Sequence, residues 1–189
     1  AVGIKFTQAY AHTVCCPSRA ALLTGRAPQR SGVNDWTSNH PSDHERRAMN
    51  LNEITIAEHL KQYGYTSGII GKWHLGATDS HDPLAQGFDY FFGFRGGFID
   101  YYTHHFLHSG RQRPPFHDLY RNTREIDENG KYFPDLQLNE VYTFLEVNRN
   151  RPFFLYVPFN LPHYPEQPDS SFVEQYKHLK WPRSSEAAM

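Results

Sequence analysis

Cysteine is scarce in this sequence, and it has neither long apolar runs nor an excess of one charge. Only Cys15 and Cys16 are present, and adjacent cysteines rarely form a disulfide, so a disulfide framework and a zinc-ribbon spacing are both excluded. No window approaches the roughly 20 apolar residues of a membrane span. Lys and Arg number 19 against 20 Asp and Glu. The resulting net charge of -1 excludes the broad positive field of a non-specific nucleic-acid binder.

Aromatic residues and histidines are plentiful. Aromatics make up 15% of the 189 residues and supply much of the expected core, while the 12 histidines are side chains that often form sites. The length fits one domain or part of a larger one. Because the chain starts without Met or a recognisable signal peptide, we expect its amino terminus to be a cut end.

Local signals predict alternating helices and strands. Pro17 suits the first turn of a helix and Gly25 its end, and Thr55 with Glu58 forms a capping box. Residues 27–50 and most of 77–132 are expected to be loops. The elements expected are helices over 17–24, 55–62, 135–148 and around 172–179, strands over 65–70 and 153–159, and a hairpin of 124–127 with 131–133 around Asn129-Gly130. The strand over 153–159 is expected to be buried, and the helix over 135–148 to pack through Leu138, Val141, Tyr142 and Leu145.

Cys15 stands where the first predicted helix begins. The orphan N–H groups and the positive end of the helix dipole make such a position a good site for a tetrahedral oxyanion. Arg19 follows one turn later on the same side, where its guanidinium can hold a charged oxygen. The alternative is a buried structural Cys beside a surface Arg.

The whole pattern C-x-P-S-R-x-x-L-x-T-G-R, from Cys15 to Arg26, resembles the signature of the type I sulfatase family at every fixed position. In that family the Cys is converted into Cα-formylglycine, an aldehyde, by a formylglycine-generating enzyme. The resemblance assigns this modification to Cys15 and leaves Cys16 at a variable position.

Residues 64–74, G-Y-T-S-G-I-I-G-K-W-H, are similar to the second signature of the family. Lys72 and His74 alternate along a segment expected to be extended, so both can face the same side and add a fixed positive charge and a proton donor near the helix terminus. The alternative is an exposed Lys and a packed His.

Three weaker matches follow in the same order. Residues 87–93 look like the segment after the second signature, and residues 100–104, D-Y-Y-T-H, look like the arylsulfatase B branch, which acts on carbohydrate sulfates. Residues 152–165 look like the segment that carries the second catalytic His of the family, which would be His163. The alternative for His163 is a packed side chain after a strand.

The roles of several loop histidines and arginines have two interpretations. His104 and His105 are expected to be surface histidines rather than site residues. Arg95, Arg111 and Arg113 either line a pocket for a sugar sulfate or are solvated cations, and the sequence does not separate these readings.

The resemblance implies a mechanism. One hydroxyl of the hydrated aldehyde attacks the sulfur of a sulfate ester to give a covalent sulfo-enzyme, and the second hydroxyl then expels sulfate. Arg19 and Lys72 would neutralise charge, His74 would act as a base in the release step, and His163 would protonate the leaving alcohol. The implied substrate is a sulfated small molecule or glycan.

The resemblance also implies an α/β fold like alkaline phosphatase, a mixed sheet flanked by helices, incomplete in this chain. Residues 1–189 are expected to be part of a sulfatase catalytic domain without its amino- and carboxyl-terminal portions. The complete enzyme is expected to bind Ca²⁺ through Asp and Asn ligands absent here, with the formylglycine from Cys15 as the ligand that this chain supplies. The chain alone is therefore expected to bind calcium weakly and to have little activity. A periplasmic, secreted or lysosomal location follows from the family alone.

Three alternatives to a sulfatase stay open. A related hydrolase could act on phosphate esters, because sulfate and phosphate share tetrahedral geometry. A catalytically silent homologue could only bind sulfated glycans, and a fragment could be merely structural.

Overall fold

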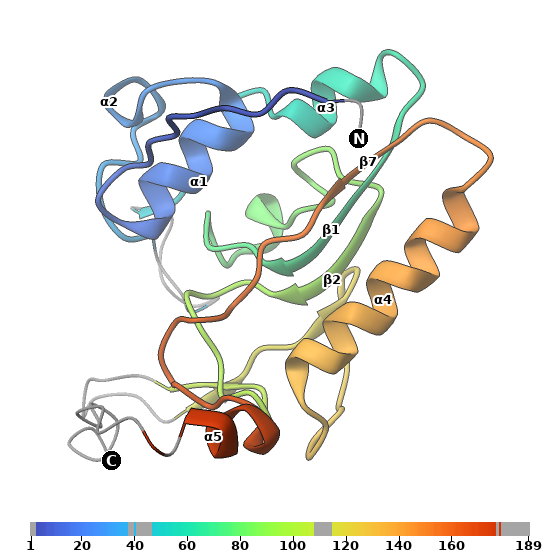
Figure 1. The fold of residues 1–189 in the computed structure, drawn as a ribbon. Helices are drawn as coiled ribbons and strands as arrows, with labels where there is room; N and C mark the ends of the chain where they lie inside the picture. The colour runs from blue at the N-terminus through green and yellow to red at the C-terminus, as the bar shows by residue number, and fades with distance from the viewer. Residues whose placement is uncertain (1–2, 38–39, 41–46, 108–114, 177, 179–189) are drawn as a thin grey trace.

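The fold is built around a five-stranded mixed sheet (Figure 1). The computed structural model describes residues 3–37, 40, 47–107, 115–176 and 178. The strand order is β6-β5-β2-β1-β7. The strands are β1 (Thr66–Lys72), β2 (Tyr90–Phe94), β5 (Tyr120–Arg121), β6 (Arg124–Glu125) and β7 (Phe153–Tyr156), with β3 (His105–Phe106) and β4 (Phe116–His117) in a separate antiparallel pair. Strand β1 pairs in parallel with both β2 and β7, whereas β5 and β6 continue the sheet antiparallel.

Helices cover both faces of this sheet. The helices are α1 (Cys15–Thr24), α2 (Pro28–Ser31), α3 (Ile56–Lys61), α4 (Phe133–Asn148) and α5 (Ser170–Tyr176), with a 3-10 turn, η2, at Asp79–His81. Helices α1 to α3 lie on one side of the sheet and α4 on the other (Figure 1). Over the described residues, no helix has the length and apolar character that crossing a membrane requires.

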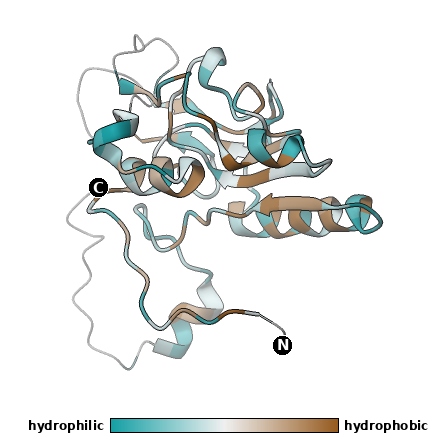
Figure 2. Cartoon of the chain, turned by 90° about the horizontal axis from the view of Figure 1, so that it is seen from above, coloured by the Kyte–Doolittle hydropathy of each residue, from teal (hydrophilic) through white to brown (hydrophobic). Residues whose placement is uncertain are grey.

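Alternating side chains of the central strands build one core on each face. Ile69 of β1 and Phe91 of β2 pack with residues of α1 and α3, whereas Ile70 and Phe92 pack on the side of α4. In Figure 2 the apolar residues gather in the central strands and recur along α4 between hydrophilic ones. This three-layer arrangement confirms the predicted mixed sheet flanked by helices.

The strongest local signals are confirmed. The helix after Cys15 ends at Gly25, which has a left-handed φ of 66°. Thr55 and Glu58 form the predicted capping box, with both reciprocal hydrogen bonds present. The expected helix around 172–179 is α5, which runs over 170–176.

Strand β7 corrects the prediction of a buried strand over 153–159. It runs only over Phe153–Tyr156, all four residues are half-buried, and it lies at the edge of the sheet with β1 as its one neighbour in the described part of the chain. Its apolar side chains resemble those of a central strand because they pack against both cores, even though one backbone edge is unpaired.

The hairpin predicted around Asn129-Gly130 is wrong. The hairpin lies earlier, where Asn122 with a left-handed φ of 55° joins β5 to β6. Gly130 instead takes a turn that leads into α4, and its N–H donates to Tyr102 O at 2.8 Å. Two expected loop regions also contain regular structure, because α2 lies within 27–50 and five short strands lie within 77–132.

The predicted packing face of α4 is wrong as well. Leu138, Tyr142 and Leu145 are exposed, and Val141 alone of the predicted set packs partly against the core. The buried residues are Phe133, Gln137, Phe144 and Asn148. The polar members of this face are satisfied, because Gln137 donates to Ile70 O at 2.8 Å and Asn148 donates to Phe144 O at 2.7 Å.

Candidate active site

Cys15 is the first residue of α1. The N-cap residue, Val14, is extended and supplies no side-chain hydrogen bond to the helix, so the first-turn N–H groups are not capped by it. The Cys15 side chain is half-buried, in keeping with a group that contacts both the protein and a ligand. The helix therefore presents a thiol and uncapped N–H groups at the same end.

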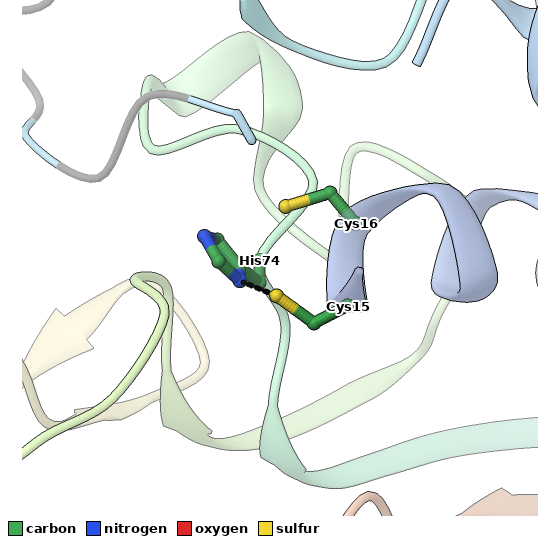
Figure 3. A group of neighbouring side chains, drawn as sticks. All are labelled: Cys15, Cys16 and His74. Atoms are coloured by element: carbon green, nitrogen blue, oxygen red, sulfur yellow. Dashed lines mark hydrogen bonds between the residues drawn. The ribbon is translucent and has the colours of Figure 1, made fainter. Parts of the chain in front are cut away.

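Strand β1 brings Lys72 and His74 to the same place. Both side chains are buried, and Nδ1 of His74 lies 3.2 Å from Sγ of Cys15 (Figure 3). The expectation of an extended segment is wrong at His74, whose φ is 61°. This left-handed turn, uncommon for a non-glycine residue, directs the ring onto the thiol, and the backbone N–H of His74 donates to Arg95 O at 3.1 Å.

Arg19 links three elements beside the thiol. Its Nη1 donates to the backbone carbonyl of Lys72 at 2.7 Å and to the hydroxyl of Tyr156, at the end of β7, at 3.2 Å. The site thus lies at the carboxyl ends of two parallel strands, the usual edge for ligands in α/β sheets. Sequence reasoning missed Tyr156, although it closes the strand that precedes His163.

Burial lowers the pKa of both basic groups next to Cys15. Burial, reinforced by the charges of Lys72 and Arg19, lowers the pKa of His74 to about 4, so its imidazole is neutral at pH 7. Burial and the Arg19 charge lower the pKa of Lys72 to about 8, which leaves it mostly charged at pH 7. The site therefore combines a neutral imidazole with fixed cations.

The two thiols have opposite tendencies. The hydrogen bond from Cys16, together with His74 and the charge of Lys72, places the pKa of Cys15 far below its usual range. The same hydrogen bond and burial raise the pKa of Cys16 well above its usual range. Both cysteines are free, and these opposite pKa shifts favour the thiolate at Cys15 and the protonated thiol at Cys16.

A cleft of about 510 Å³ opens over Cys15 and Arg19. Its lining comes from the segment before α1, from α1 itself and from the end of β7: Tyr10, Ala11, His12, Cys15, Ser18, Arg19, Ala21, Leu22 and Tyr156. The cleft gives a ligand access to the half-buried Cys15 side chain.

The hydrogen bond and the ring contact of His163 are to residues outside the group around Cys15. Its Nδ1 donates to Tyr164 O at 2.8 Å, and its ring stacks on Phe98 at 5.3 Å between centroids. No contact within the described residues joins it to Cys15. The structure therefore brings together Cys15, Arg19, Lys72 and His74, and the role of His163 stays a prediction.

The expectation of surface histidines is wrong for His104. Its side chain is fully buried, Nε2 donates to Lys131 O at 3.0 Å, and burial lowers its pKa. Arg95 is likewise no solvated cation, because its side chain is buried. Its Nη2 lies 2.5 Å from Oδ2 of Asp82, and its guanidinium lies over the ring of Tyr120. Arg111 and Arg113 lie outside the described residues.

The donor atoms near Cys15 do not fit calcium. Among the described residues, the group that could hold a metal ion is Cys15, Cys16 and His74, whose ligand atoms all lie within 4.8 Å of one another. Calcium takes six to eight oxygen ligands, whereas thiols and imidazole suit softer metals. These three residues alone therefore do not form a calcium site.

Comparison with known proteins identifies the family. The Sulfatase family model matches residues 1–188, so the chain belongs to the sulfatase family. It is 31% identical over 183 residues to mouse (Mus musculus) arylsulfatase J, covering 95% of this chain and 30% of that protein. It is 34% identical over 196 residues to N-acetylgalactosamine-6-sulfatase of the dog (Canis lupus familiaris), covering 92% and 35%. The chain thus spans about a third of the length of these relatives.

Comparison with solved structures finds a similar fold. The structure of Ps i-CgsB in complex with k-i-k-neocarrahexaose superposes with a TM-score of 0.74 at 29% identity, covering 90% of this chain and 40% of that one. The fold is accordingly the alkaline-phosphatase-like fold of sulfatases, of which this chain forms a part.

Proposed function

We propose that this chain carries the catalytic group of a sulfuric ester hydrolase, an aldehyde hydrate formed from Cys15. The observation that supports this most is the position of Cys15, on the uncapped first turn of α1, with its sulfur 3.2 Å from Nδ1 of the buried His74. A hydroxyl at the same position would have an imidazole partner. Membership of the sulfatase family supports the conversion itself.

The aldehyde hydrate supplies two hydroxyls, one to attack sulfur and one to drive the release of sulfate. The residues around it do the rest. His74, neutral at pH 7 because burial lowers its pKa, can accept a hydroxyl proton at Nδ1. Lys72 and Arg19 bring positive charge to the place where the sulfuryl oxygens would lie, and losing one such donor typically costs about 10² to 10³ in rate.

The leaving alcohol needs a proton, and we assign that task to His163. It follows β7, the strand that also supplies Tyr156 beside Arg19. The ring lies against Phe98 and is exposed, so it is open to solvent and to a bound ligand. His163→Gln is expected to lower turnover most for sulfate esters of poor leaving groups, because those depend most on the acid.

We further propose that the substrate is a carbohydrate sulfate. The support is the name of one relative, N-acetylgalactosamine-6-sulfatase, and the oligosaccharide bound in the Ps i-CgsB structure. Residues 1–189 would be part of the catalytic domain, with carboxylate ligands for Ca²⁺ supplied from outside this chain. A formylglycine-generating enzyme would act on Cys15, and a periplasmic, secreted or lysosomal location would follow from the family.

The test compares turnover of an aryl sulfate by converted protein that contains this chain together with the proposed Ca²⁺ ligands, and by the Cys15→Ser variant of that protein. Ser provides one hydroxyl but no second one, so the variant is expected to be unable to complete repeated turnovers. Cys16→Ala, which removes the neighbouring thiol, is the matched control and is expected to keep most of the turnover. Multiple turnovers by Cys15→Ser would refute the aldehyde mechanism.

The silent homologue remains the competing function. Binding of a sulfated oligosaccharide without turnover, by converted protein that also contains the proposed Ca²⁺ ligands, would favour it, because the cations of the site would then hold sulfate without cleaving it.

A further inference from the structure

In a chain whose Cys15 has not been converted, the thiols of Cys15 and Cys16 and the imidazole of His74 form a group that could hold a metal ion. We propose that the folded, unconverted chain binds one Zn²⁺ ion through Cys15, Cys16 and His74. The unconverted chain lacks the aldehyde and cannot act as a sulfatase, so zinc binding to it is tested independently of the proposed function.

The spacing of the donor atoms suits tetrahedral zinc. The ligand atoms of the three residues all lie within 4.8 Å of one another, and Sγ of Cys15 is 3.2 Å from Nδ1 of His74. With Zn–S near 2.3 Å and Zn–N near 2.0 Å, tetrahedral angles place two sulfurs about 3.8 Å apart and a sulfur and a nitrogen about 3.5 Å apart. Shifts of a few tenths of an ångström to about 1 Å therefore bring the three atoms onto one ion.

The side chains already converge. Figure 3 shows both sulfur atoms on the side of α1 that faces the ring of His74, with Nδ1 directed at Cys15. The His74 side chain is nine-tenths buried or more, and its Nε2 has no hydrogen-bond partner among the described residues. The ring is thus held in place by packing and offers Nδ1 to the thiols.

Thr37 supports this group from behind. Its backbone N–H points at Sγ of Cys16 at 3.3 Å, and its hydroxyl donates to the backbone carbonyl of His74 at 3.0 Å. N–H groups that donate to ligand sulfurs, and hydrogen bonds that fix ligand residues, are the outer contacts that orient metal ligands. One residue therefore holds two of the three proposed ligands.

The donor set determines which ion fits. Two thiolates and an imidazole are soft or borderline ligands that favour Zn²⁺ over Ca²⁺ or Mg²⁺. The two thiolates carry two negative charges, which balance the ion and limit its repulsion from the buried Lys72. Both sulfurs bind as thiolates, so the proton held by Cys16 is released to solvent, and three protein ligands leave the fourth position to water.

Conversion and zinc binding exclude each other at Cys15. The aldehyde has no sulfur, so converted chain keeps only Cys16 and His74 of the three ligands. A zinc-bound Cys15 sulfur is likewise engaged in a metal bond and is not a free thiol for the converting enzyme.

The experiment uses the full chain produced without conversion, with the Cys15 thiol verified by peptide mass. Co²⁺ is titrated as a spectroscopic probe and then displaced by Zn²⁺ in competition with a chromophoric chelator. One equivalent is expected, with thiolate-to-cobalt charge-transfer absorption and the strong visible bands of a tetrahedral ion. Cys16→Ser and His74→Gln are each expected to weaken binding by about 100-fold or more, beyond the effect of losing an outer contact. His105→Gln, at a histidine outside the group, is the control and is expected to leave binding unchanged.

The Co²⁺ spectrum of the unconverted parent chain tests the proposed zinc site even if a variant folds poorly. Absence of thiolate-to-cobalt absorption at one equivalent would overturn the proposal, and so would affinity that survives both Cys16→Ser and His74→Gln. Converted protein provides a separate comparison, because its affinity for Zn²⁺ is expected to fall by about 100-fold or more.

Discussion

Replacing Lys72 with Met is expected to stabilise the folded chain while it removes activity. Lys72 is 2% exposed, and burial lowers its pKa from 10.5 to about 8. Each pKa unit corresponds to about 1.4 kcal/mol, so the charged side chain costs the folded state about 3 kcal/mol relative to the unfolded chain at pH 7. Met fills a similar volume without the charge, and we expect it to raise the free energy of unfolding by about 2–3 kcal/mol at pH 7.

The pH dependence follows from the sign of this shift. Below pH 8 the folded state carries the full cost of the charge, and above pH 10.5 Lys72 is neutral in both states, so the advantage of Met fades between these values. Urea unfolding of unconverted Lys72→Met and parent chain across this range measures the difference. Turnover of the converted variant is expected to fall by about 10² to 10³.

A Lys72→Met chain that is less stable than the parent at pH 7 would refute this reasoning. It would show that contacts of the ammonium group with Cys15 outweigh the cost of its burial.

Three further changes test other parts of the structure. Gly93→Ala is expected to destabilise the fold by about 3 kcal/mol or more in urea unfolding, because φ is 146° and the added Cβ would lie 1.9 Å from a backbone carbonyl oxygen of β1. His74→Gln is expected to remove up to about 3 kcal/mol of the stability loss between pH 6.5 and 4, since the unfolded chain binds a proton that native His74 refuses; an unchanged pH profile would contradict this. Asp82→Asn is expected to cost about 3–5 kcal/mol, because it leaves Arg95 buried with a weaker partner. Its control, Asp79→Asn on the fully exposed partner of the same Arg, is expected to cost less than about 1 kcal/mol by thermal unfolding.

The elements that sequence reasoning predicted well carry their signals within a few residues. The capping box of Thr55 and Glu58 and the stop at Gly25 depend on local backbone hydrogen bonds, so the chain folds there as its neighbouring residues dictate. The chemistry at Cys15 and Arg19 was likewise visible, because one helical turn brings the two side chains to the same side.

The features that sequence reasoning missed depend on distant parts of the chain. The apolar stripe of α4 through Leu138 and Tyr142 faces outward, and the helix packs through Gln137, whose amide is satisfied by a carbonyl 67 residues away in sequence. His104 is buried because Lys131 supplies a carbonyl that no local pattern announces. The left-handed turn at His74 was also invisible, since only the tertiary structure holds a non-glycine residue at that φ.

The site shows the same division. Sequence motifs indicated Lys72 and His74 as neighbours of Cys15, but the contact of Arg19 with Tyr156 follows from how β7 and α1 pack. The second thiol, at a variable position in the motif, lies with its sulfur within 4.8 Å of that of Cys15.

We expect Cys15, and not Cys16, to become an aldehyde at the start of α1. The most direct test is the mass of the tryptic peptide that contains both cysteines, from protein coexpressed with a formylglycine-generating enzyme, after carbonyl-specific labelling. One carbonyl label is expected, located at Cys15 by fragmentation, with Cys16 still a thiol. Active protein in which both residues remain thiols, or in which the label lies on Cys16, would contradict it.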